Sequence, residues 1–159
     1  MRILALVVSL MISASAATQN TEPAESWLLL EQAASATITD GRLTLTGVDD
    51  TIIAFSDRPN RDVASESLSG LVDNWSRGEN SFAQTPPNAA LTGLQKGQQI
   101  GLIVELSDPI LEDGVLSFTV EVLNGKGNYV LSNPSLVIDN LCRTKSGNQS
   151  FWGSMFGCN

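Results

Sequence analysis

The densest cluster of residues that could do chemistry lies at positions 55–62, where the sequence reads FSDRPNRD. Two guanidinium groups, Arg58 and Arg61, stand beside Asp57 and Asn60. A guanidinium presents its donors in a planar fork that matches a carboxylate or a phosphate, so the cluster predicts a site for a small anionic ligand or a protein carboxylate. The alternative role is structural, with the arginines pairing to the neighbouring aspartates and holding the turn in place.

Two further segments complete this candidate site. Trp75 ends a predicted helix and offers a flat ring surface beside the arginines, although packing in the core is its alternative role. Paired prolines at positions 86 and 87 favour an extended backbone suited to recognition. Phe82, shortly before them, is expected to fill the core. The candidate ligand-binding residues are therefore Asp57, Arg58, Asn60, Arg61, Trp75 and Asn88.

Histidine is absent from the chain, which removes the commonest general base near neutral pH and the commonest zinc ligand. No glycine loop for phosphate, nucleophile elbow or paired-carboxylate motif is present. The expectation is a non-enzymatic binding module without a cofactor. One alternative is a hydrolase that uses carboxylate chemistry, with Asp57 or Asp139 as base or nucleophile. Another is a surface component stabilised by Ca²⁺ at Asp49-Asp50 or at Asp108 with Glu112-Asp113.

The charge balance excludes one class of partner. Nine Lys and Arg residues stand against 17 Asp and Glu residues, for a formal net charge of −8. A strongly acidic domain is repelled by phosphate backbones and by anionic membrane surfaces, so nucleic acid is not an expected partner. Cationic partners stay possible, and acidity that keeps an exported protein soluble is the alternative explanation. The partner is expected to be a protein or a small ligand.

Residues 1–16 have the form of an export signal. Met1-Arg2 supplies a positive start, an apolar run covers positions 3–12, and Ala14-Ser15-Ala16 forms a small-residue cleavage site. The run is too short to span a bilayer, which needs about 20 apolar residues. No other stretch comes close to that length. The sequence therefore predicts a mature protein that begins at Ala17, lies in a periplasm or outside the cell, and has no membrane span.

Two cysteines lie near the C-terminus, at positions 142 and 158. In an exported chain an even count predicts a disulfide, here Cys142 to Cys158. Closing a loop of about 15 residues contributes about 3 kcal/mol in the chain-entropy model. A redox pair is the alternative, but such pairs usually have C-x-x-C spacing. The expected organisation is a signal peptide (1–16), a flexible N-terminus (17–25), one β domain (26–141) and a disulfide-closed tail (142–159).

Short β-type segments separated by turn residues dominate the expected domain. Apolar and polar residues alternate at 35–39, 42–46 and 115–123. Further strands are expected from the apolar or β-branched segments 27–31, 51–55, 89–94, 99–106 and 136–138, with turns at Asp40-Gly41 and Ser107-Asp108-Pro109. Between them, apolar residues at positions 68, 71, 72 and 75 have helical spacing and predict one amphipathic helix over 65–76, with Ser65 near its N-cap. This pattern predicts an antiparallel β-sandwich of immunoglobulin-like type. The Cys–Trp–Cys spacing of true immunoglobulin domains is missing, so the strand topology stays open.

The combination FSDRPNR, a helix that ends in Trp75, and SFAxxPPNAxL resembles a family of small exported microbial proteins of unassigned function. The resemblance covers about residues 35–139. Members often carry Gly and His after the second arginine, where this chain has Asp62-Val63-Ala64. The resemblance implies export and a single domain, and it implies no reaction. It is carried mainly by Phe55, Ser56, Asp57, Arg58, Pro59, Arg61, Trp75, Phe82, Pro86, Pro87, Asn88 and Ala89.

Overall fold

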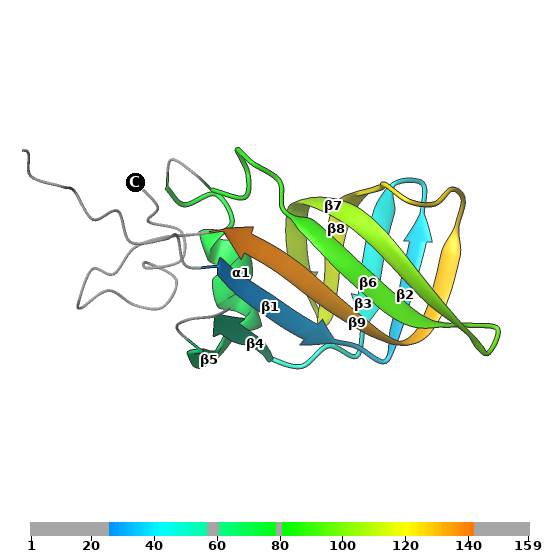
Figure 1. The fold of residues 1–159 in the computed structure, drawn as a ribbon, viewed down its shortest axis with the longest axis horizontal. Helices are drawn as coiled ribbons and strands as arrows, with labels where there is room; N and C mark the ends of the chain where they lie inside the picture. The colour runs from blue at the N-terminus through cyan, green and yellow to red at the C-terminus, as the bar shows by residue number, and fades with distance from the viewer. Residues whose placement is uncertain (1–25, 57–60, 79–80, 142–159) are drawn as a thin grey trace, which may run out of the picture.

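The computed structural model describes residues 26–56, 61–78 and 81–141 of the chain. Within these ranges the chain forms nine strands and one short helix (Figure 1). The elements are β1 (Ser26–Gln32), β2 (Ser35–Thr39), β3 (Arg42–Thr46), β4 (Thr51–Ser56), β5 (Val63–Ser67), α1 (Leu68–Asn74), β6 (Asn88–Gln95), β7 (Gln98–Glu112), β8 (Val115–Val122) and β9 (Tyr129–Leu141). Cys142 and Cys158, with the predicted signal and tail, lie outside the described residues.

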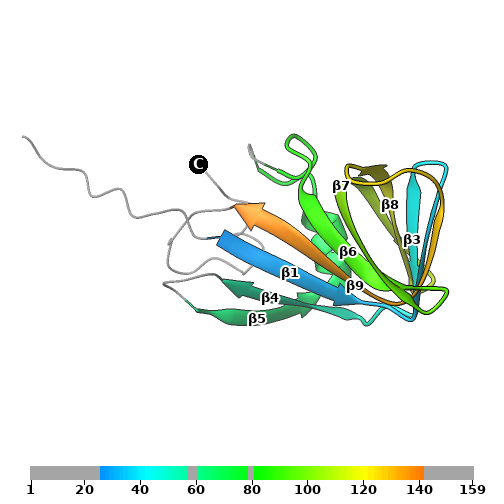
Figure 2. The same cartoon turned by 45° about the vertical axis from the view of Figure 1, so that its right-hand side comes forward.

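All of these strands belong to one antiparallel sheet, in the order β2-β3-β8-β7-β6-β9-β1-β4-β5. An additional pairing of β2 with β9 closes the first six strands of that order into a barrel. Strands β1, β4 and β5 continue beyond β9 and are called the extension here (Figure 2). The prediction of a mainly antiparallel β fold with one short helix is confirmed. The structure corrects the expected sandwich, because one sheet closes on itself where two packed sheets were expected.

The barrel closes because β9 is long enough to pair with two strands along one side. Its C-terminal part pairs with β1, from Ser26↔Leu141 to Gln32↔Ser135, and its N-terminal part pairs with β2. Between the two parts, Asn133 has a φ of 48° and Pro134 follows it. This bend lies opposite the break between β1 and β2, where Asn133 N–H donates to the Ala34 carbonyl (3.0 Å). One bent strand therefore belongs to both the barrel and the extension.

The hydrophobic core is a single cluster that runs from the barrel interior to α1. Trp75, directly after α1, packs against Phe118 of β8 with ring centroids 5.6 Å apart and against Phe82 at 4.7 Å. Phe82 is buried, as the sequence predicted. The barrel contributes Leu43, Leu45, Leu91, Leu102, Val104, Leu106, Leu116, Phe118 and Leu131 to this cluster.

The helix is shorter than the sequence predicted, because its expected first turn belongs to a strand. Ala64 pairs with Ala54 of β4, and the neighbouring residues extend this pairing to form β5. The N-cap is Ser67 and not Ser65: the Ser67 hydroxyl accepts a hydrogen bond from Gly70 N–H (3.1 Å). The small and polar sequence VASES has weak β propensity, so β5 exists because β4 pairs with it.

One of two predicted turns is confirmed, and the other is a bulge within a strand. Asp40 and Gly41 have φ values of 50° and 73° and connect β2 to β3, as expected for a tight hairpin. Ser107-Asp108-Pro109, expected to be a turn, is a bulge inside the continuous strand β7, with a register shift between Ser107 and Ile110. A bulge accommodates both the proline, which has no N–H, and the positive φ of Asp108 (47°).

Candidate functional site

The two faces of the extension differ in how they are covered. The inner face carries Leu29 of β1 with Ile52 and Ala54 of β4, all at or near 0% exposure. Helix α1 covers this face and lies behind β1 and β9 in Figure 1. The alternate residues of the same strands point to the other side, which is called the outer face here. Nothing in the described part of the chain covers the outer face.

A continuous line of apolar side chains crosses five strands on the outer face. In β4 and β1, Ile53 pairs with Leu30, and Leu30 pairs in turn with Val137 of β9. Val137 pairs with Ala90 of β6, which pairs with Ile103 of β7. Ile53 is 47% exposed and Ile103 is 42% exposed. These five residues form what is called the apolar row: Ile53, Leu30, Val137, Ala90 and Ile103.

A second line of residues runs beside the apolar row and changes character along its length. At the β5 side it is apolar, because Val63 pairs with Phe55 and Phe55 pairs with Leu28. Val63 is 77% exposed. Leu28 pairs with Asp139 of β9, which is exposed. Glu105 of β7 continues the line, opposite Asn88. The outer face is therefore apolar along the whole apolar row. The neighbouring line is apolar toward β5 and acidic toward β7.

Of the predicted arginine cluster, which follows β4 in the chain, Arg61 is the described member. Asp57, Arg58 and Asn60 lie outside the described residues, whereas Arg61 is exposed and has a φ of 62°. The segment connects β4 to β5, and not a strand to a helix as expected. It is closed at its base, because Ser56 N–H donates to the Asp62 carbonyl (2.9 Å) and Asp62 N–H donates to the Ser56 hydroxyl (2.8 Å).

The second predicted segment reaches the same end of the sheet. Asn88, the first residue of β6, is exposed on the outer face and lies level with Asp139. Two strands, β9 and β1, separate β6 from β4. At a spacing of about 4.8 Å between strands, Asn88 lies about 14 Å from the end of β4. The end of β4 and the start of β6 therefore lie at the same end of the sheet, with β1 and β9 between them.

Trp75 and Pro87 are both buried, whereas a ligand site requires side chains that the ligand can reach. Trp75 is 4% exposed, so its ring faces belong to the core and offer no surface beside the arginines. Its indole Nε1 is buried and has no hydrogen-bond partner in the described part of the chain. Pro87 is buried, and its carbonyl accepts a hydrogen bond from Leu106 N–H (3.1 Å). Both residues position the neighbouring surface and do not form it.

The carboxylates proposed for catalysis or for Ca²⁺ binding are scattered. Asp139 lies on the open outer face, and Asp57 lies outside the described residues. Within ranges 26–56, 61–78 and 81–141, no three His, Cys, Asp or Glu side chains are grouped so that they could hold a metal ion. No helix in those ranges combines the length and apolar character needed to cross a membrane.

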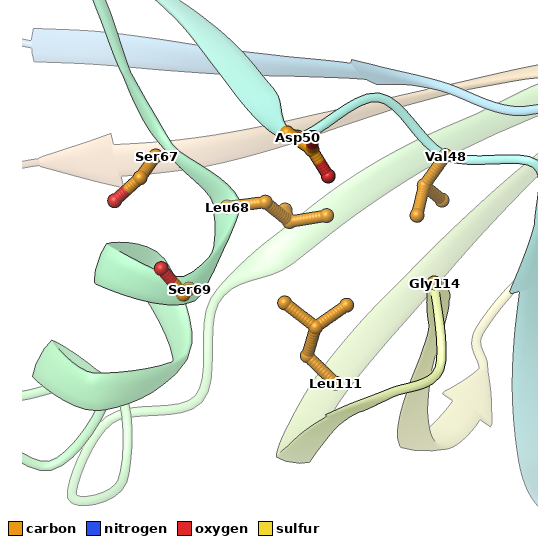
Figure 3. Close-up of a pocket in the computed structure, with 7 residues that line it drawn as sticks. All are labelled: Val48, Asp50, Ser67, Leu68, Ser69, Leu111 and Gly114. Atoms are coloured by element: carbon orange, nitrogen blue, oxygen red, sulfur yellow. The ribbon is translucent and has the colours of Figure 1, made fainter.

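A pocket of about 260 Å³ lies where α1 meets the β3–β4 connection and the β7–β8 turn. Leu68 and Leu111 point toward one another across it (Figure 3). The Ser67 hydroxyl at its edge is already used to cap α1, and the Asp50 carbonyl accepts a hydrogen bond from Leu68 N–H (2.8 Å). None of the predicted ligand-binding residues lines this pocket, whereas Asp50, considered in the sequence analysis for Ca²⁺, does. Its lining residues are Val48, Asp50, Ser67, Leu68, Ser69, Leu111 and Gly114.

Sequence analysis missed one buried acid, Glu31 of β1. It is 2% exposed, and neither carboxylate oxygen has a partner that meets hydrogen-bond geometry. Burial raises the pKa of Glu31 from 4.5 to about 7; the backbone amide of Asp49 opposes this rise, the Asp49 charge adds to it, and the Gln32 amide opposes it. The alternation of Trp27, Leu29 and Glu31 on one face was the signal that could have found it.

A scan against protein-family models, a search of curated proteins and a search of solved structures each found no match to this chain. The resemblance to a family of small exported proteins therefore stays a prediction.

Proposed function

We propose that this protein is an exported, non-enzymatic binding module that holds a protein partner on the outer face. Export rests on the signal-like residues 1–16, and the binding role rests on the sheet. Its candidate contact surface is the apolar row together with Arg61, which follows β4, and Asn88 at the start of β6. The core-forming side chains on the opposite face of these strands hold the surface in place.

The apolar row is the observation that carries the proposal. Side chains that alternate in a strand normally place polar residues on a solvated face and apolar residues on the core face. Here Ile53 and Ile103, at the two ends of the row, are each more than 40% exposed. Between them, three further apolar residues continue the row without a polar interruption. A contiguous exposed apolar patch with a polar rim is typical of a protein interaction site.

The charges around the row define the partner's chemistry. Asp139 and Glu105 lie on the acidic end of the neighbouring line. The whole chain carries a net charge of −8, which attracts basic surfaces over long range and repels acidic ones. The surface therefore fits a partner that presents apolar side chains flanked by Lys or Arg.

A photo-crosslinking experiment in the source cells tests this proposal. A photoreactive amino acid is placed at Ile53 or Ile103 on the outer face, and as a control at Thr39, which is exposed at the end of β2. We expect the same protein to be crosslinked from both outer-face positions and not from Thr39. That protein is then purified, and its affinity is measured with wild type and with Ile103→Arg.

The affinity measurement decides the result. Ile103→Arg places a positive charge in the apolar row and should weaken binding by tenfold or more, about 1.4 kcal/mol. Thr39→Arg adds the same charge away from the row and should change the affinity little. Equal crosslinking from Thr39, or an unchanged affinity of Ile103→Arg, would contradict a role for the outer face.

A further inference from the structure

We propose that β5 accepts an extended segment of the partner as an added strand, so that the bound protein has a ten-stranded sheet. This inference rests on the proposed function and specifies how the partner is held. It follows from the backbone of β5, from its regular pairing without proline, lysine or a bulge, and from the side chains on the two faces of the strand.

The backbone of β5 presents unpaired polar groups on one side. Strand β5 is the last strand in the sheet order, with β4 as its neighbour in the described part of the chain. Leu68 N–H donates to the Asp50 carbonyl, and Ser56 N–H donates to the Asp62 carbonyl. In an antiparallel ladder the bonded pairs alternate, so the bonded residues of β5 are Ala64 and Glu66.

The alternate residues of β5 therefore direct their N–H and C=O groups away from β4. Within the strand these residues are Val63 and Ser65, and no further strand lies on their open side in the described part of the chain; Ser67, at the end of the strand, is the N-cap of α1. Their spacing of two residues is the spacing at which an antiparallel partner strand bonds. An added strand would satisfy these groups without moving any residue of the extension.

Strand β5 also lacks three of the features with which proteins protect an edge, namely proline, lysine and a bulge, and the charged residue that it does carry is Glu66 on the inner face. Natural edges carry proline, lysine, a bulge or a covering loop, which prevent pairing with another chain. The sequence VASES contains neither proline nor lysine, and its pairing with β4 is regular from Thr51↔Ser67 to Phe55↔Val63. A regular edge without proline, lysine or a bulge, beside an apolar surface, is suited to strand addition.

The side chains of β5 specify the residues that the added strand should carry. On the outer face, an apolar side chain beside Val63 would extend the line of Leu28, Phe55 and Val63 and cover Val63, which is 77% exposed. On the other face, Glu66 is half-buried and favours a Lys or Arg directly across from it. The expected ligand is an extended segment with alternating apolar residues and a basic residue on the opposite face.

A display library of random peptides of about 12 residues tests the inference with a defined probe. Peptides enriched on the wild-type protein should show period-two apolar patterns with interspersed Lys or Arg. Their affinities are measured with wild type, Ser65→Pro and Gln99→Pro. Proline at position 65 removes an N–H that β4 does not use, so we expect the fold to persist while peptide affinity falls about tenfold or more.

Gln99→Pro is the matched control. The bond from Leu106 N–H to the Pro87 carbonyl shows that even-numbered residues of β7 bond to β6, so Gln99 N–H also points away from its neighbouring strand. Gln99→Pro therefore also introduces a proline at a residue whose N–H is not bonded to the neighbouring strand β6. We expect Gln99→Pro to bind the peptides as wild type does.

A second measurement does not depend on the folding of a variant. Peptides with N-methyl groups at alternate backbone amides should lose binding when the methylated set faces β5, and should retain it when the other set is methylated. Equal affinity of both methylated sets, unchanged affinity of Ser65→Pro, or no enriched peptide at all would overturn strand addition. Peptides that bind Ser65→Pro normally but fail with Ile103→Arg would overturn it while supporting the outer face as the binding surface.

Discussion

Glu31 of β1 pairs with Leu136 of β9, and both side chains are buried, with exposed fractions of 2% and 1%. A carboxyl group in this position has apolar neighbours and an acidic one, Asp49, whose charge adds to the effect of burial on its pKa. Asp49 is the charged group that acts on Glu31. The folded protein therefore holds a proton on Glu31 more tightly than the unfolded chain does.

This tighter binding predicts a pH-dependent stability with a definite sign. The folded pKa of about 7 exceeds the unfolded value of 4.5, so the contribution is fully present below pH 4.5 and is lost as pH rises to about 7. A shift of that size corresponds to at most about 3 kcal/mol. In Glu31→Gln, which cannot ionise, this fall should disappear. Urea unfolding at pH 4.5, 6 and 8 measures it, and an identical pH profile in both proteins would contradict the prediction.

Trp75→Ala should destabilise the protein by about 3–5 kcal/mol, because removing a buried indole leaves a cavity beside Phe82 and Phe118. Trp75→Phe keeps an aromatic ring and should cost less. Equilibrium denaturation measures both variants. A ligand-contacting tryptophan would give the opposite result: an unchanged free energy of unfolding in Trp75→Ala together with loss of binding.

Ser67→Ala should lower the free energy of unfolding by about 1 kcal/mol, since it removes the acceptor for Gly70 N–H at the start of α1. Ser69→Ala, two residues later and exposed, is the control and should have little effect. Thermal unfolding of the two variants compares them directly. Equal losses in both would mean that the cap contributes nothing specific.

Gly93→Ala and Gly101→Ala should have opposite effects. A Cβ at Gly93 would lie 3.0 Å from Leu131 Cβ and 3.3 Å from the Ser132 carbonyl oxygen, where β6 and β9 shift register. A Cβ at Gly101, in the next strand, would have no heavy atom within 4 Å. We expect a loss of about 1–3 kcal/mol for Gly93→Ala and a gain of about 0.5 kcal/mol for Gly101→Ala. Chemical denaturation that ranks them the other way would contradict the close approach of β6 to β9.

The sequence could identify candidate site residues, but it could not show which other side chains lie around each of them in the folded protein. The arginine cluster and Asn88 were predicted to act jointly. In the structure the end of β4 and the start of β6 lie at the same end of the sheet, with two strands between them. Trp75 could not be separated from a core residue, because helical spacing is the same for a ring that faces Phe118 and for one that faces solvent. The apolar row could not be predicted, since its members come from five strands whose register no local pattern specifies.

The sequence by itself determined the local elements. Strands 35–39 and 42–46 were predicted with their observed bounds, because side-chain alternation and the Asp40-Gly41 turn involve only neighbouring residues. Only the tertiary structure decided that the sheet closes, that residues 63–67 form a strand, and that Glu31 is buried. Each of these depends on pairing between distant residues, such as Ala36 with Leu131, whose free energy comes from burial that no short segment achieves alone.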